Sequence, residues 1–224
     1  MNQTINNILT NFTSPKYSNS HFISIEGIEG AGKTAQLRFM QSYLEGKGYT
    51  VTIVREPGGT KFGEGLRSAI LESTTSLSPV AEAYLFASSR AQLLKETILN
   101  NLEIEKNIII CDRYIDSSLV YQGYAGKLGI EQVMQIHNLY PLNTLPNITF
   151  YLKVSIETSI KRMDIRNNDK DYFESKGEYF FQQLVNGYDH VKKLFPDRIH
   201  EIDGEQSEKD VSIDIQKELD ILIG

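Results

Sequence analysis

The chain has 224 residues, 40% of them hydrophobic and 23% charged, which suits one globular domain with a full core. Its net charge of −6 argues against a general nucleic-acid-binding protein, because such proteins are usually basic. The single cysteine, Cys111, excludes an internal disulfide, and no apolar run is long enough to span a membrane, so we expect a cytoplasmic protein that binds neither nucleic acid nor membrane.

Residues 1–20 are rich in Asn, Thr and Ser and carry one charge, at Lys16. They have neither the apolar stretch of a signal peptide nor the arginines of a transit peptide. We therefore expect a disordered extension over residues 1–20 and a single domain over residues 21–224.

A glycine-rich loop follows the first predicted strand, at 21–26, and precedes a predicted helix at 35–44. Its sequence fits the P-loop pattern G-x-x-x-x-G-K-[ST] and reads Gly27-Ile28-Glu29-Gly30-Ala31-Gly32-Lys33-Thr34. Backbone N–H groups of such a loop point at phosphate oxygens, its lysine contacts the terminal phosphates, and the Thr34 hydroxyl can hold Mg²⁺. An ordinary glycine-rich turn is the alternative, and the strand–loop–helix context disfavours it.

The remaining elements alternate between strands and helices. Further strands are predicted at 49–55, 107–111, 148–154 and 198–202, and helices at 62–71, 79–102, 117–121, 130–139, 155–163, 179–195 and 207–222. This order predicts an α/β fold whose parallel sheet of about five strands is covered on both faces. Ligands of such folds bind at the carboxyl ends of the strands.

Charged residues follow two of these strands. Asp112 closes a buried strand, where a carboxylate can hold Mg²⁺ through water or simply cap the strand. The planar guanidinium of Arg113 suits a second phosphate, although it could equally pair with a surface carboxylate. Arg55 ends the second predicted strand and so points to the same edge of the sheet. The turn after it contains Pro57 and could either line the site or have a structural role only.

A base-binding site is one interpretation of two further pairs. Phe86 and Arg90 lie four residues apart on a predicted helix and so share a face, where one could stack on a base and the other bind its edge. A phenylalanine at such a position is otherwise part of the core. Tyr121 and Gln122 are open to the same two interpretations, because glutamine can bind an amide-like base edge but is also common on surfaces.

The segment 161–171 is dense in charged residues. It is either a solvated loop or part of a lid, at about 164–176, that closes over ATP and brings arginines to the γ-phosphate. The histidines at 21, 137, 190 and 200 lack the spacing of a transition-metal site.

Four stretches together resemble the thymidylate kinases of the bacterial type. They are the segment 22–34, Arg55-Glu56-Pro57-Gly58-Gly59-Thr60, Leu85-Phe86-Ala87-Ser88-Ser89-Arg90, and the segment 112–123, which begins Asp112-Arg113-Tyr114. The resemblance implies a P-loop nucleoside monophosphate kinase fold with a small lid. It also implies transfer of the ATP γ-phosphate to dTMP, giving dTDP, with Mg²⁺ and in a homodimer.

The resemblance also implies roles for individual residues. Glu29 would lie near the nucleotide sugar and phosphate, and an adenine loop would fall near Asp203-Gly204. The dTMP site would be made by Arg113 and Arg55 on the phosphate, Phe86 stacked on thymine, Arg90 and Gln122 on its polar edge, and Ser118, Tyr121 and Pro57 around the pocket.

The chain departs from the family at the catalytic arginine. One subclass has an arginine at the position of Gly30, and the other commonly has an Asp-Arg pair in the lid, where this chain has Asp171-Tyr172. Arg162, Arg166 and Lys170 remain as candidates, and we expect Arg166 to act, with Arg162 as support.

Two rival functions stay open at this point. One is a nucleoside monophosphate kinase with another acceptor, such as dUMP, dCMP or AMP. The other is a P-loop switch or ATPase that drives a partner protein, although the Asn-Lys-x-Asp pattern of GTPases and the Leu-Ser-Gly-Gly pattern of ABC ATPases are both absent from the sequence.

Overall fold

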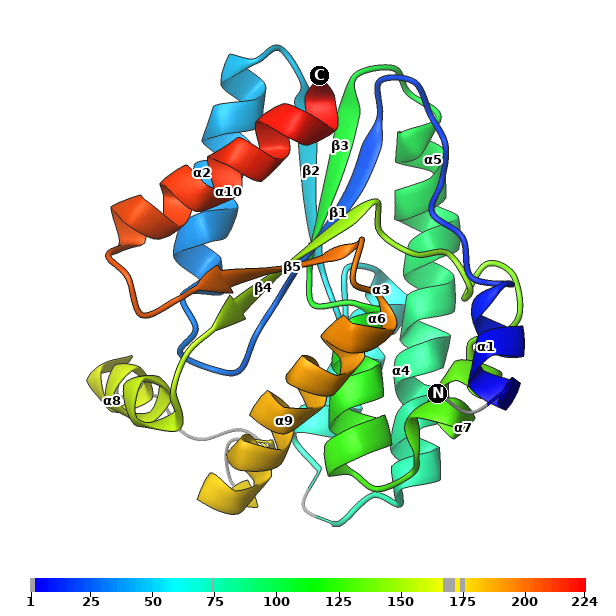
Figure 1. Ribbon diagram of the computed structural model, residues 1–224. Coiled ribbons are helices and arrows are strands. Elements are labelled where there is room, and N and C mark those ends of the chain that lie inside the picture. The colour runs from blue at the N-terminus through cyan, green and yellow to red at the C-terminus, as the bar shows by residue number, and fades with distance from the viewer. Residues whose placement is uncertain (1–2, 74, 167–171, 174–175) are drawn as a thin grey trace.

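The computed structural model in Figure 1 describes residues 3–73, 75–166, 172–173 and 176–224. Its five strands form one parallel sheet in the order β2-β3-β1-β4-β5. The strands are β1 (His21–Glu26), β2 (Thr50–Arg55), β3 (Asn107–Asp112), β4 (Ile148–Lys153) and β5 (Ile199–Asp203). The α/β class and the parallel sheet predicted from the sequence are confirmed.

Helices cover both faces of this sheet (Figure 1). They are α1 (Gln3–Leu9), α2 (Lys33–Gly46), α3 (Lys61–Leu71), α4 (Pro79–Leu93), η1 (Leu94–Ile98), α5 (Leu99–Leu102), α6 (Ile115–Ser118), η2 (Leu119–Ala125), α7 (Ile130–Ile136), α8 (Ile156–Arg166), α9 (Glu178–Leu194) and α10 (Glu208–Ile223). Helices α2 and α10 pack together on one face, while α4, η2 and α9 belong to the other. Within the part of the chain that is described, no helix has both the length and the apolar character needed to cross a membrane.

The register of the sheet brings charged strand ends together. Arg55 of β2 is opposite Asp112 of β3, and Asp112 is opposite Ile25 of β1. The apolar run of β3 is buried over Asn107–Cys111, so only the end of the strand reaches a surface. The carboxyl edge of the sheet therefore gathers the P-loop, Arg55 and Asp112 at one place, as parallel strands require.

The N-terminal segment differs from the prediction of a disordered extension. Its helix α1 packs against α7, and the side chains of Ile8 and Phe12 are only 8% and 7% exposed. Backbone contacts continue past the helix, since Thr13 pairs with Thr144. The few apolar residues of a polar segment are thus buried where they meet an existing core.

Candidate active site

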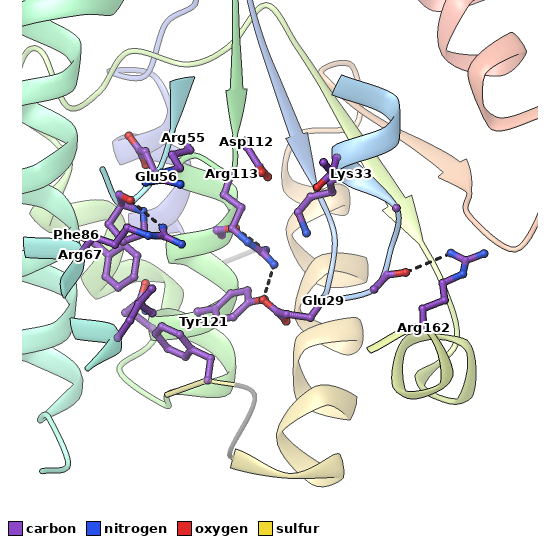
Figure 2. A pocket seen from close by; sticks show the side chains of 18 of the residues that line it. Glu29, Lys33, Arg55, Glu56, Arg67, Phe86, Asp112, Arg113, Tyr121 and Arg162 are labelled. Carbon is purple, nitrogen blue, oxygen red and sulfur yellow. Dashed lines mark hydrogen bonds and ion pairs between the residues drawn. The ribbon is translucent and has the colours of Figure 1, made fainter. Parts of the chain in front are cut away.

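A cavity of about 530 Å³ opens where strands β1, β2 and β3 end. Figure 2 shows Lys33, Asp112 and Arg113 at its centre, with Arg55, Glu56 and Phe86 towards one side and Arg162 beyond the loop on the other. Its wall includes Glu29, Gly30, Gly32, Lys33, Thr34, Arg55, Glu56, Pro57, Arg67, Phe86, Asp112, Arg113, Ser117, Tyr121, Gln122, Arg162 and Phe173. Most of the residues that the sequence singled out thus come together around one space.

The P-loop has the backbone that its glycines permit. Gly27 has φ 142° and Gly30 has φ 75°, and a Cβ at Gly30 would lie only 2.7 Å from the carbonyl oxygen of Ser159. The loop leads directly into α2, whose positive N-terminal end faces any anion bound there. The loop thus has the backbone that a phosphate site requires, and at Gly30 it leaves no room for a larger residue.

Lys33 lies in this loop with its ammonium folded back on the backbone. Its Nζ donates to the carbonyl oxygens of Gly27 at 3.1 Å and Ile28 at 3.3 Å. Burial, and then the nearby charge of Arg113, lowers the pKa of Lys33 to about 8. Gly27, Ile28 and Ala31 are not on the cavity wall. The carbonyl oxygens of Gly27 and Ile28 instead hold the Lys33 ammonium.

Asp112 and Thr34 both carry oxygen atoms and lie with Lys33 on the cavity wall. The Oδ1 atom of Asp112 is buried and has no hydrogen-bond partner among the described residues. A buried carboxylate oxygen without a partner is costly, and a hard cation or its water would satisfy it. This pair fits Mg²⁺, which prefers oxygen ligands and keeps several waters.

Arg113 has an unusual backbone for a non-glycine residue, with φ 65°. The left-handed region costs such a residue roughly 1–2 kcal/mol. The backbone N–H of Arg113 donates to Ile25 O at 3.0 Å, which stabilises the turn. The side chain thereby leaves β3 towards the P-loop, and strain of this kind is often found at functional sites.

The guanidinium of Arg113 is held from three sides. It contacts Glu29 at 2.6 Å, Tyr188 Oη at 3.2 Å and Ser117 Oγ at 3.3 Å, and Tyr121 Oη donates to the same Glu29 carboxylate. Burial alone would raise the pKa of Glu29, but the charges of Arg113 and Lys33 outweigh it and the pKa is lowered. Glu29 is therefore an ionised acceptor at the centre of the cavity.

Glu26 lies behind Arg113 and was missed by the sequence analysis. Its carboxylate accepts from Tyr114 N at 2.7 Å, Ser117 Oγ at 2.6 Å and Tyr188 Oη at 3.0 Å. Burial, and then the charge of Asp116, raises the pKa of Glu26 to about 7. Because Ser117 and Tyr188 also contact Arg113, this carboxylate helps to fix the arginine from behind.

The far end of the cavity is aromatic. The Phe86 ring lies 6.2 Å from that of Phe173, and Tyr121 meets Phe173 edge to face at 5.3 Å. Arg67 of α3 joins the same wall and donates to Pro57 O at 3.0 Å. Phe173 and Arg67 were also missed, although Arg67 follows the Gly-Gly turn by two helical turns and so could have been placed near the strand end.

Arg90 and Ser118 do not line the cavity. Arg90 is 1% exposed, and its guanidinium is bonded to Glu56, to Ser118 Oγ at 3.0 Å and to His137 Nε2 at 2.7 Å. Burial, and then the charge of Arg90, lowers the pKa of His137 to about 3, so the imidazole is a neutral acceptor. Of this cluster, Glu56 alone reaches the cavity wall, and Arg90 lies directly behind it.

The two candidate lid arginines, Arg162 and Arg166, both belong to α8. Arg162 donates to the carbonyl oxygens of Gly30 at 3.3 Å and Gly204 at 3.0 Å, which joins the P-loop to the loop after β5 (Figure 2). Arg166 is the last residue of α8. Lys170, Asp171 and most of the lid predicted at 164–176 lie outside the described residues.

Arg55 is half-exposed and pairs with Glu64 at 2.9 Å.

Residues 25–215 match the thymidylate kinase family. Among similar proteins are a thymidylate kinase of Thermoanaerobacter sp. (strain X514), 44% identical over 87% of this chain and 94% of that protein, and one of Bacillus licheniformis, 40% identical over 84% and 90%. The solved thymidylate kinase of Ehrlichia chaffeensis is 29% identical, covers 90% of this chain and 99% of its own, and has a TM-score of 0.71.

Proposed function

The chain belongs to the thymidylate kinase family and is a dTMP kinase that uses ATP, and from this premise we propose how the residues of the cavity carry the reaction. At the ATP end, the P-loop N–H groups and Lys33 bind the phosphates. The carbonyl contacts of Lys33 supply a preorganised ammonium, whose bonds exchange for phosphate oxygens when ATP enters.

Thr34 and Asp112 would hold Mg²⁺. The Asp112 oxygen that has no partner among the described residues supports this assignment. When bound, the ion neutralises charge on the ATP phosphates. A cytoplasmic location stays a prediction.

At the dTMP end, Arg113 and Arg55 bind the acceptor phosphate and Phe86 stacks on thymine. Arg113 carries a fork of N–H donors that suits a phosphate bidentately, and it already lies between the P-loop and the aromatic wall. Pro57, Tyr121 and Gln122 complete the wall. Arg90 and Ser118 lie behind this wall. Arg90 contacts both Glu56, which reaches the wall, and Ser118.

The reaction needs positioning and positive charge more than proton transfer, because the acceptor is already a phosphate anion. Lys33 and Arg113 supply fixed charge on the two sides of the transferred group, and a lid arginine adds charge on closure. Glu29 orients Arg113 and is displaced or shared when the phosphates arrive, since phosphate is the stronger bidentate partner.

One observation carries this proposal: a single cavity joins Lys33 of the P-loop to Phe86 and Gln122. Arg113 lies between Lys33 and Phe86 (Figure 2). The test is an assay of ADP release with ATP and a panel of acceptors. We expect dTMP to be the best acceptor, with dUMP somewhat poorer, because one methyl in an apolar pocket is worth about 1–3 kcal/mol. Slow ADP release that ignores every acceptor would instead indicate a P-loop switch.

We also propose a homodimer. Three large apolar side chains are exposed on the neighbouring helices α3 and α4: Phe62 at 52%, Val80 at 48% and Tyr84 at 57%. Exposed apolar side chains on two helices that pack together suit an isologous contact between two copies. Sedimentation of the wild type and of Phe62→Asp tests it, and a wild type that is monomeric at micromolar concentration would rule it out.

A further inference from the structure

Gln122 lies on the wall of the proposed base site and is itself held from behind by a carboxylate. Its amide nitrogen Nε2 donates to Glu82 Oε1 at 2.7 Å. Glu82 belongs to α4, is 4% exposed and is not on the cavity wall. The contact is therefore buried and joins a cavity residue to a charge in the layer behind it.

This contact fixes which end of the Gln122 amide faces Glu82. An ionised carboxylate can only accept hydrogen bonds, so the NH₂ group must point at it and the carbonyl oxygen must point away. The ammonium of Lys176 lies 3.8 Å from Glu82 Oε2, the other oxygen of the same carboxylate. The orientation of Gln122 thus follows from the chemistry of its partner.

The opposite end of the amide is left without a partner. Gln122 is 1% exposed, and its Oε1 is buried with no hydrogen bond to any described residue. A buried amide oxygen that stays unbonded costs about 1–3 kcal/mol. Because Gln122 lies on the cavity wall, a base that enters the cavity and reaches this atom can satisfy it with an N–H donor.

We propose that Glu82 is a positioning residue that sets base specificity: by holding the Gln122 amide, it presents a single acceptor to the base and so selects an imide N3–H. Thymine and uracil carry that donor, whereas the N3 atom of cytosine is itself an acceptor and would face the Gln122 oxygen with a lone pair. The proposal rests on the base site assigned above.

The test compares kcat/KM for dUMP and dCMP, because neither has the thymine methyl and the two differ at the polar edge. In Glu82→Gln the new amide can accept from or donate to Gln122, so Gln122 can turn and offer an N–H to the base. We expect the dUMP-to-dCMP ratio to fall at least about tenfold, since a mismatched buried hydrogen bond carries most of such discrimination. Glu103→Gln, which removes the same charge from an exposed site, should leave the ratio unchanged.

Two further variants separate positioning from stability. Glu82→Met fills the same space without an acceptor and should also lower the ratio, which keeps the test available if Glu82→Gln does not fold. The double variant Glu82→Gln with Gln122→Glu exchanges donor and acceptor but again turns an acceptor to the base. It should restore a ratio in favour of dUMP, a rescue that a merely structural role of Glu82 does not predict.

The outcomes distinguish this inference from the base site itself. If the wild type does not prefer dUMP to dCMP, the base site is wrongly assigned. If the wild type prefers dUMP, Gln122→Ala removes the preference, and Glu82→Gln and Glu82→Met both leave the ratio within twofold, the base site stands and the role of Glu82 is overturned.

Discussion

Arg113 and Glu29 form a close ion pair across the P-loop, with 2.6 Å between Nη2 and Oε1 and side chains only 17% and 14% exposed. The pair holds a guanidinium at the place where the two substrates' phosphates would meet. It also keeps that guanidinium paired before any phosphate arrives, so Arg113 is not an uncompensated buried charge.

Arg113→Lys should therefore weaken dTMP far more than ATP. Lysine keeps the charge but loses the planar fork that binds phosphate bidentately and contacts Glu29, Ser117 and Tyr188 together. We expect the KM for dTMP to rise at least about tenfold, with the KM for ATP nearly unchanged. Steady-state kinetics measure both. Arg38→Lys on the exposed side of α2 is the matched control, and an equal rise in both KM values would contradict the assignment of Arg113 to the acceptor.

Lys33→Ala should remove nearly all turnover while leaving dTMP binding intact. The ammonium contacts the loop carbonyls of Gly27 and Ile28 and lies with the P-loop, away from Phe86. Calorimetry with dTMP alone measures the acceptor site independently of the chemistry. A loss of dTMP affinity as large as the loss of kcat would show that the two sites are not separate.

The P-loop could be predicted because its signal is local: eight consecutive residues and the elements on either side determine it. The gathering of Arg55, Asp112 and Arg113 could also be predicted, because parallel strands end at one edge. The cluster of Glu56, Arg90 and His137 could not. These residues are 34 and 47 positions apart in the chain, and only the packing of α4 against α7 brings them together.

The packing of the N-terminal segment was not predicted, for a related physical reason. Composition averages over residues 1–20, whereas burial depends on single side chains such as Ile8 and Phe12 and on the surface that they meet. The base site shows the same limit, since the sequence suggested Gln122 but contained no sign that Glu82 would orient it.

Phe12→Ala tests the importance of that segment. The side chain is 7% exposed, and truncating a buried phenylalanine typically costs about 3–5 kcal/mol. A domain of this size loses roughly 2–4 °C of melting temperature for each kcal/mol. We expect a melting temperature clearly below that of the wild type, with KM for dTMP unchanged because Phe12 is not on the cavity wall. Ile221→Ala, at a residue 76% exposed, is the control, and equal melting temperatures for both variants would show that the segment does not contribute.

His137 should make stability depend on pH. Its ring faces the Arg90 guanidinium on one side, with Glu56 beyond it, and Val133 O on the other, and its pKa in the fold is about 3. The unfolded chain takes up a proton at this histidine below about pH 6.5 and the folded protein does not, so the stabilisation is lost as pH falls.

The comparison is with His137→Gln, which can still accept from Arg90 but does not titrate. Between pH 7.5 and 5 the wild type should lose about 2 kcal/mol more than the variant. Urea unfolding at the two pH values measures the difference. If both proteins respond to pH in the same way, His137 is protonated in the fold and does not serve as a neutral acceptor for Arg90.

The last prediction concerns the catalytic arginine. Gly30 cannot be an arginine here, because a side chain at that position would collide with Ser159 O, so the charge must come from the lid. Arg162 already donates to the carbonyl oxygens of Gly30 and Gly204, and this supporting role leaves Arg166, at the end of α8, as the residue that can move with closure. Arg166→Ala should lower kcat by about 10³ with little change in either KM, since the contact forms mainly in the transition state. Arg162→Ala should instead raise the KM for ATP, because it releases the P-loop from the loop after β5. If kcat of Arg166→Ala stays within about threefold of the wild type, far below the effect of an arginine finger, the role passes to Arg162 or Lys170.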